Sequence, residues 1–237
     1  MKYIIMADGY GLRWHNYNGI PKHLIEIDGE TLLARAVRLI HERDEGAEII
    51  ITSHDPRYDI DGATRYEPKD NKIEIDRFTW ELIEDNCCFL YGDTYYSDAA
   101  MDEIISKDGE DILFFGSAKS IVAIKVYDSE LFRKHVSNVK KLYLDGEITK
   151  CVGWQVYQSF MGQEICEAIH ARRKFNSDSY NASGYGRFFY WRQKWRGSWQ
   201  CEKYYRFFLY AVCSADKDRL FADFAVSGIF VGDERGH

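Results

Sequence analysis

The sequence of 237 residues contains few prolines and no long hydrophobic segment. Its three prolines form no proline-rich linker, and neither a low-complexity segment nor an internal repeat divides it. No apolar run approaches the roughly 18–20 residues of a membrane-spanning helix, so we expect no membrane span. Apolar residues make up 46% and charged residues 29%, a balance typical of a soluble globular chain with a substantial core. We therefore expect a single domain over residues 1–237.

The cysteines and histidines lack the spacings of common metal sites. The six cysteines, at positions 87, 88, 151, 166, 201 and 213, contain no C-x-x-C pair, and the seven histidines contain no H-x-x-x-H pair. These absences exclude the usual zinc motifs. Met1-Lys2 leads into only four apolar residues, too few for a secretory signal. We therefore expect reduced, buried thiols and a cytoplasmic protein.

The net charge of −7 argues against general nucleic-acid binding. The charge is uneven, however, because residues 172–206 carry nine Lys/Arg, two Asp/Glu and eleven aromatic residues. Trp191, Trp195 and Trp199 recur there every four residues, so a helix would carry them on one face. Such a face is typical of core packing; a pocket for a phosphorylated or cationic group, a homodimer interface and a membrane-surface helix are the alternatives. We treat residues 187–237 as an aromatic and basic extension of the domain.

Short apolar runs alternate with amphipathic segments over roughly the first 140 residues. The runs predict strands at residues 3–6, 48–52, 87–91, 112–115 and 121–126, and residues 24–27 alternate between apolar and polar before the turn at Asp28-Gly29. Helices are predicted after the capping residues Thr31, Asp76 (residues 77–84) and Ser129, and at residues 163–171. This alternation predicts an α/β fold, a Rossmann-like three-layer α/β/α sandwich around a mixed, mostly parallel sheet.

The turn after the first predicted strand has the composition of a phosphate-binding loop. Residues 7–13 read A-D-G-Y-G-L-R, and Pro21-Lys22 follow. A parallel sheet binds its ligand where strands end at their carboxyl termini. The two glycines let backbone N–H groups approach an anion, and Arg13 and Lys22 supply positive charge. The dinucleotide pattern G-x-G-x-x-G fails because Trp14 stands at its third glycine, and the Walker sequence is absent.

Two stretches, Ala7–Arg13 and Pro21–Leu33, resemble the start of the nucleotidyltransferase family, which includes sugar-phosphate nucleotidylyltransferases and phosphocholine cytidylyltransferases. The family pattern is roughly A-A-G-x-G-[ST]-R, then P-K-x-L-x-x-[IV]-x-G-x-P-L-L. Three positions depart from it: Asp8 replaces a small residue, Leu12 replaces Ser or Thr, and Glu30-Thr31 replaces a residue–proline step. The resemblance implies a fold of the nucleotide-diphospho-sugar transferase type.

The resemblance also implies a Mg²⁺ cofactor. Phe89–Asp93 resembles the family's apolar strand ending in G-D, which gives Asp93 the role of metal ligand. The family's second aspartate comes from a later D-[IV]-[DN]-T stretch; Asp178 is the nearest candidate and Asp145 is its rival. Mg²⁺ takes hard oxygen ligands, usually one or two carboxylates plus substrate phosphates. We therefore expect Asp93 and Asp178 to hold the metal.

Roles for the opening turn follow from the same resemblance. Arg13 would contact the departing β- and γ-phosphates, and Lys22 would offset charge near the α-phosphate. The triphosphate would be held by the nucleotide-binding stretch Ala7, Asp8, Gly9, Tyr10, Gly11 and Leu12. Five further residues follow predicted strands at the same edge, where they could contact substrate or simply form polar loops and packing: Ser53, His54, Asp55, Tyr95 and Tyr96.

These features predict a Mg²⁺-dependent nucleotidyltransferase. It would transfer a nucleoside monophosphate from a nucleoside triphosphate to a phosphorylated small molecule, either a sugar 1-phosphate or a phosphocholine-like compound, and release pyrophosphate. A glycosyltransferase of the same fold, with a nucleotide-sugar donor and typically a D-x-D metal site, is an alternative. A catalytically silent nucleotide-binding scaffold is another, favoured by Asp8 and Leu12. Pyrophosphate release separates the enzyme from the scaffold, and hydrolysis of a UDP-sugar would mark the glycosyltransferase.

Overall fold

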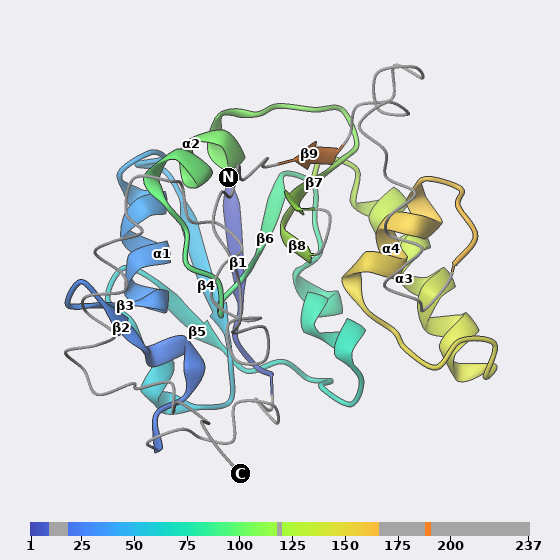
Figure 1. The fold of residues 1–237 in the computed structure, drawn as a ribbon, viewed down its shortest axis with the longest axis horizontal. Helices are drawn as coiled ribbons and strands as arrows, with labels where there is room; N and C mark the ends of the chain where they lie inside the picture. The colour runs from blue at the N-terminus through green and yellow to red at the C-terminus, as the bar shows by residue number, and fades with distance from the viewer. Residues whose placement is uncertain (10–18, 118–119, 166–187, 191–237) are drawn as a thin grey trace, which may run out of the picture.

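The computed structural model describes residues 1–9, 19–117, 120–165 and 188–190. Its centre is a seven-stranded sheet with the strand order β5-β4-β1-β6-β8-β7-β9 (Figure 1). Strand β8 runs antiparallel to β6 and β7, and the other neighbouring pairs are parallel. The predicted mixed, mostly parallel sheet is therefore confirmed. The strands are β1 (Lys2–Met6), β4 (Glu48–Thr52), β5 (Thr64–Tyr66), β6 (Cys87–Tyr91), β7 (Ile112–Ser117), β8 (Ser120–Val126) and β9 (Phe188–Tyr190).

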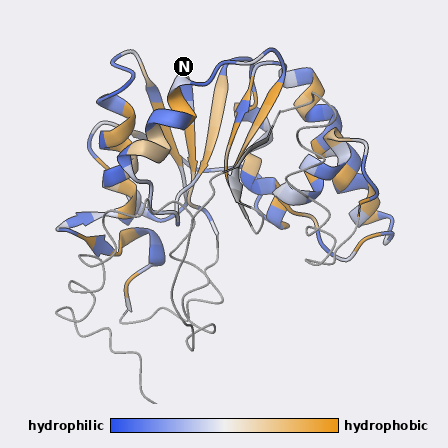
Figure 2. Ribbon diagram, turned by 45° about the horizontal axis from the view of Figure 1, so that its top comes forward, coloured by the Kyte–Doolittle hydropathy of each residue, from blue (hydrophilic) through white to orange (hydrophobic). Residues whose placement is uncertain are grey.

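Helices cover both faces of this sheet. Along β1, Tyr3 and Ile5 pack into one core with α1 (Leu32–His41) and α2 (Asp98–Ser106). Their neighbours Ile4 and Met6 pack into a second core with α3 (Ser129–Leu144) and α4 (Gly153–Phe160). The alternation follows from the two-residue period of a strand, and Figure 2 shows the apolar strands between helices whose polar residues face outward. The predicted three-layer α/β/α sandwich is confirmed.

The adjacent cysteines of β6 lie on opposite sides of the sheet. Cys87 belongs to the second core and Cys88 to the first. Both are buried and free, as is Cys151. The prediction of buried cysteines is confirmed for these three residues.

The predicted helix over residues 77–84 is wrong. Two 3₁₀ turns stand there, η4 (Glu74–Phe78) and η5 (Trp80–Leu82), separated by Thr79 with φ 44°. Asp76 lies inside η4, and its carboxylate accepts hydrogen bonds from the backbone N–H groups of Lys72 and Ile73. The Asp76 side chain therefore caps the start of η4 and not a helix that follows it. The left-handed conformation of Thr79 interrupts the chain shortly afterwards, so no α-helix starts at Arg77.

Other boundaries also differ from the sequence prediction. The alternating stretch 24–27 is divided between η2 (Lys22–Leu24) and β2 (Glu26–Ile27), which forms a hairpin with β3 (Glu30–Thr31). Helix α3 is capped by Asp128, whose side chain accepts from Leu131 N, and not by Ser129. Residues 163–165 are not helical, and the rest of the helix predicted there lies outside the described residues. The prediction omitted α2 and α4, and almost every residue of α4 is buried.

Thr31 was predicted correctly as the residue that caps α1, because its side chain accepts a hydrogen bond from Ala34 N.

Among the described residues, no helix combines the length and the apolar character needed to cross a membrane.

Candidate functional site

Strand register brings three polar segments together at one edge of the sheet. Met6, the last residue of β1, lies level with Thr52 of β4 and Tyr91 of β6. Backbone hydrogen bonds extend the alignment, from Ala7 N to Thr52 O (3.1 Å) and from Gly92 N to Met6 O (3.0 Å). The segments that follow the three strands, residues 7–9, 53–55 and 92–93, therefore leave the sheet side by side, at the edge where α/β proteins bind ligands.

Lys22 and Asp93 form an ion pair at this edge. Lys22 comes from η2 and Asp93 from the turn after β6, and their side chains are 18% and 27% exposed. Burial alone would raise the pKa of Asp93, but Lys22 beside it, together with Arg77, holds that pKa below its ordinary value. The site therefore contains an ionised carboxylate and a fixed cation that remain within reach of solvent.

A neutral imidazole lies beneath this pair. His23 is 3% exposed, and its Nδ1 lies 2.9 Å from the hydroxyl of Tyr58. Burial lowers the pKa of His23 to about 4, so the ring is uncharged at neutral pH. Gly92 packs directly on the ring, because a Cβ at Gly92 would stand 3.2 Å from His23 Cδ2 and 3.0 Å from Met6 O.

Asp8, which departs from the family pattern, connects three loops. Its two carboxylate oxygens accept hydrogen bonds from the backbone N–H of His54 (2.9 Å) and from Asn71 Nδ2 (2.7 Å). The second oxygen also lies 2.8 Å from His54 Nδ1. Asn71 Nδ2 further donates to the carbonyl of Asp8 (2.7 Å). Both carboxylate oxygens thus join the end of β1 to neighbouring segments, an arrangement that accounts for an acidic residue beside a predicted phosphate turn.

Arg77 is a cation of this edge that the sequence analysis did not assign to the site. A Cβ at Gly9 would stand 3.2 Å from Arg77 Nη2 and 3.3 Å from its Cζ, so the guanidinium lies against the first glycine of the turn. No local pattern marks Arg77, because it lies sixty-eight positions after Gly9 and only the packing of η4 brings the two residues together. The sequence analysis also did not identify Asn71, because its partner Asp8 is similarly distant in the sequence.

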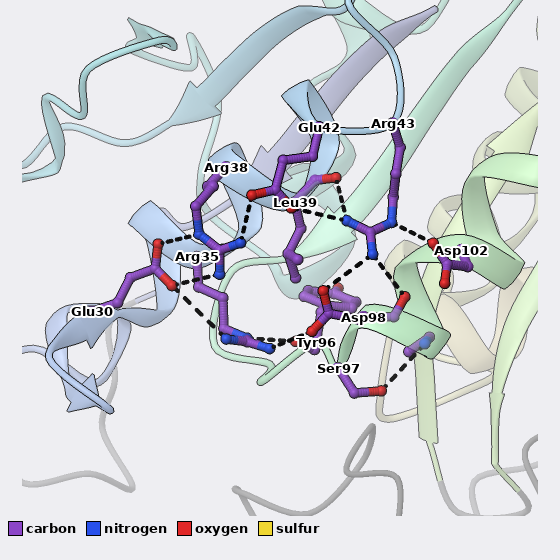
Figure 3. Close-up of polar contacts among 11 residues, drawn as sticks. Glu30, Arg35, Arg38, Leu39, Glu42, Arg43, Tyr96, Ser97, Asp98 and Asp102 are labelled. Atoms are coloured by element: carbon purple, nitrogen blue, oxygen red, sulfur yellow. Dashed lines mark hydrogen bonds and ion pairs between the residues drawn. The ribbon is translucent and has the colours of Figure 1, made fainter. Parts of the chain in front are cut away.

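The turn that carries Asp93 is closed by the side chain of Tyr96. The Tyr96 hydroxyl accepts from Tyr91 N (3.0 Å) and donates to the carbonyl of Val122 (2.7 Å). Arg35 of α1 binds the two tyrosines that follow this turn. Its Nε donates to the Tyr96 carbonyl (2.7 Å), and its guanidinium lies 4.5 Å from the centre of the Tyr95 ring. Figure 3 shows Arg35 reaching from α1 to this segment. Tyr95 and Tyr96 are buried, which agrees with packing rather than contact with substrate.

The structure brings together five of the predicted site residues: Ala7, Asp8, Gly9, Lys22 and Asp93. Tyr10, Gly11, Leu12, Arg13 and Asp178 lie outside the described residues. Asp145 is an exposed cap at the end of α3, in agreement with its interpretation as a surface turn. Of the other polar candidates, Ser53 is buried and His54 is exposed at the site edge.

The donor set fits one carboxylate ligand of a Mg²⁺ ion. Asp93 is ionised and partly exposed, and hard carboxylate oxygens are what Mg²⁺ prefers. Among the described residues, no group of three or more His, Cys, Asp or Glu side chains could hold a metal ion. A Mg²⁺ ion bound at Asp93 would therefore also need oxygen atoms from other sources, such as substrate phosphates, water, the backbone or residues beyond those described.

Comparisons with known proteins found no matching family and no matching curated protein. Similar solved structures include a protein described as a glucose-1-phosphate thymidylyltransferase from Bacillus anthracis (17% identity, 70% of this chain and 84% of that chain, TM-score 0.48). Another is a 4-diphosphocytidyl-2C-methyl-D-erythritol synthase from Anaerococcus prevotii (15%, 70% and 83%, TM-score 0.43). A third is the CTP:phosphocholine cytidylyltransferase from Streptococcus pneumoniae (16%, 68% and 83%, TM-score 0.39).

Proposed function

We propose that the chain is a Mg²⁺-dependent nucleotidyltransferase of the cytoplasm. It transfers a nucleoside monophosphate from a nucleoside triphosphate to a phosphorylated small molecule and releases pyrophosphate. The observation that carries the proposal is the meeting of Lys22 and Asp93 beside Gly9 at the carboxyl edge of β1 and β6. These residues come from three separate stretches of sequence that all resemble the nucleotidyltransferase family.

The proposed reaction requires positioning and charge neutralisation more than proton transfer. An oxygen of the acceptor phosphate forms a bond to the α-phosphorus, and the bond from that phosphorus to the bridging oxygen of the β-phosphate breaks. The electron pair leaves with pyrophosphate. The acceptor phosphate is already ionised at neutral pH, so no general base is needed.

Each residue of the site has a part in this proposal. Lys22 contacts the phosphate under attack, Gly9 lets the triphosphate approach the backbone, and Arg13 binds the departing phosphates. Asp93, with Asp178, would hold Mg²⁺, which supplies charge neutralisation at the phosphate oxygens. The acceptor is a sugar 1-phosphate or a phosphocholine-like compound, as the sequence resemblance implies.

A thermal-shift panel tests the proposal first. CTP, UTP, GTP, ATP and dTTP are each measured with and without Mg²⁺ on wild type, Asp93→Ala and Lys22→Ala. Asp102→Ala, on the exposed surface of α2, is the matched control. A ligand at about 100 times its Kd adds roughly 2.7 kcal/mol, or about 5–10 °C for a chain of this size. We expect one nucleotide to produce a Mg²⁺-dependent shift that both site variants abolish and the control retains.

Pyrophosphate release with that nucleotide and each acceptor class then tests catalysis. The absence of a shift with every triphosphate would contradict the proposal. Nucleotide binding without pyrophosphate release for any acceptor would favour the silent scaffold, and hydrolysis of a UDP-sugar would favour the glycosyltransferase.

A further inference from the structure

We propose that Arg77 binds a phosphate group of the substrate, opposite Lys22, so that two cations contact the phosphate from the two faces of the sheet. This inference rests on the proposed function and adds a binding residue that the family pattern does not supply. The phosphate belongs either to the triphosphate chain or to the phosphorylated acceptor.

The two cations reach the site edge from different layers. Lys22 lies on η2, and Leu24 of the same turn packs against the first core, on the side of α1 and α2. Arg77 lies on η4, and Ile75 and Phe78 of that turn belong to the second core, on the side of α3 and α4. A ligand above the ends of β1 and β6 would therefore meet one cation from each side.

Contact with Gly9 places the Arg77 guanidinium at the phosphate turn. Its Nη2 and Cζ occupy the space 3.2–3.3 Å from where any other residue at position 9 would carry its Cβ. The guanidinium is also close enough to Asp93 to help hold the pKa of that carboxyl below its ordinary value. Arg77 thus belongs to the same charged group as Lys22 and Asp93.

The guanidinium retains donors for a ligand. Among the described residues its ion-pair partner is Glu74, at 3.7 Å from Nη1, and the Glu74 side chain is 44% exposed. The Arg77 side chain is itself 29% exposed. A guanidinium has five N–H donors in a planar fork that matches two phosphate oxygens. A phosphate would be a stronger partner than a distant, solvated carboxylate.

The turn that carries Arg77 is rigidly held. The Phe78 ring packs edge-on against Phe89 and Phe132, at centroid distances of 5.4 and 5.3 Å. The Asp76 carboxylate, 5% exposed, binds Lys140 Nζ at 2.7 Å and caps the start of the turn. Arg77 lies between these two anchors, so little of its backbone freedom remains to be lost when a ligand binds.

Titration calorimetry with pyrophosphate tests the inference without requiring turnover. The variants are Arg77→Gln, which removes the charge, and Arg77→Lys, which retains a charge but loses the fork. Arg57→Gln is the matched control, because Arg57 is a 57%-exposed arginine after β4 that already pairs with Asp55. We expect Arg77→Gln to weaken pyrophosphate binding about 10- to 100-fold and Arg77→Lys to weaken it less, with Arg57→Gln within about twofold of wild type.

The same variants are titrated with glucose 1-phosphate, with phosphocholine and with the five triphosphates. A loss confined to pyrophosphate and triphosphates places Arg77 on the donor, and a loss confined to the phosphomonoesters places it on the acceptor. Equal affinities for all ligands in wild type and Arg77→Gln would overturn the inference, as would a wild-type chain that binds none of them. Pyrophosphate binding that depends on Arg77, without any nucleotidyl transfer, would support the inference and reject the proposed function.

Discussion

Gly92 restricts the position of Asp93, the proposed metal ligand. It precedes Asp93 and is sandwiched between the Met6 carbonyl and the His23 ring, with room for no side chain. The backbone carbonyl cannot move away, because it accepts the Gly92 N–H at 3.0 Å.

We expect Gly92→Ala to lower the free energy of unfolding by about 1–3 kcal/mol through overpacking, and the Tm by roughly 2–12 °C. Urea unfolding and calorimetry measure both quantities. Gly46→Ala is the control, because a Cβ there would meet its nearest atom at 3.7 Å and the residue has no positive φ. Equal stability of the two variants would show that the close approach at Gly92 has no energetic importance.

His23 predicts a specific pH dependence of stability. Burial lowers its pKa in the folded chain to about 4, and the ordinary value is 6.5. The nearby charges of Lys22 and Arg77 act in the same direction, and that of Asp93 opposes them. Between these pH values the unfolded chain takes up a proton that folded His23 does not, so acidification favours unfolding.

The expected loss between pH 7 and pH 5 is roughly 2 kcal/mol of unfolding free energy. Urea denaturation at half-unit pH steps, on wild type and His23→Asn, measures it. The difference between the two curves isolates His23 from the carboxylates, which titrate mainly below this range. Parallel curves for the two proteins would mean that His23 is not buried as a neutral ring.

At the scale of elements, two arginines of α1 differ in importance, and Arg35 is the one that joins the helix to the segment after Asp93 and to α2. Figure 3 shows Arg35 and Arg38 on one helix, each contacting Glu30. Arg35 is 10% exposed and bonds the Tyr96 carbonyl, whereas Arg38 is 41% exposed and bonds only carboxylates among the described residues. Buried hydrogen bonds from a charged group stabilise more than exposed ion pairs do.

We therefore expect Arg35→Ala to cost about 2–3 kcal/mol of unfolding free energy and Arg38→Ala to cost less than about 1 kcal/mol. Urea denaturation measures both. Hydrogen exchange of residues 92–97 should rise locally in Arg35→Ala, because the segment after Asp93 loses its anchor. An Arg38→Ala variant as unstable as Arg35→Ala would contradict this ranking.

For the whole molecule, the two cores share one sheet and should unfold as one unit. Cys87 faces the second core and Cys88 the first, so the two thiols report on opposite layers from adjacent positions. Burial raises the pKa of Cys87 to about 11 and that of Cys88 to about 12, which makes both thiols unreactive in the folded chain.

Brief alkylation across a urea series, read by tandem mass spectrometry, should give the same midpoint for the two cysteines. The midpoint should also match that of circular dichroism. Earlier labelling of Cys87 would show that α3 and α4 separate from the sheet before the rest of the chain unfolds.

The sequence by itself determined the features that depend on neighbouring residues. The apolar runs of β1, β4 and β6 and the Thr31 cap of α1 were predictable because strand alternation and helix capping are local. The resemblance that singles out Lys22 and Asp93 as site candidates also rests on short stretches of sequence. The helix expected at residues 77–84 failed because the left-handed Thr79 and the capping by Asp76 outweighed local propensity.

Only the tertiary structure decided which distant residues meet. Strand register aligned the ends of β1, β4 and β6, and this alignment gave Asp8 the partners His54 and Asn71. Packing of η4 on the second core carried Arg77 to Gly9, and packing of η2 on the first core carried Lys22 to Asp93. Such contacts depend on the summed burial of two cores rather than on any local pattern, so no short stretch of sequence specifies them.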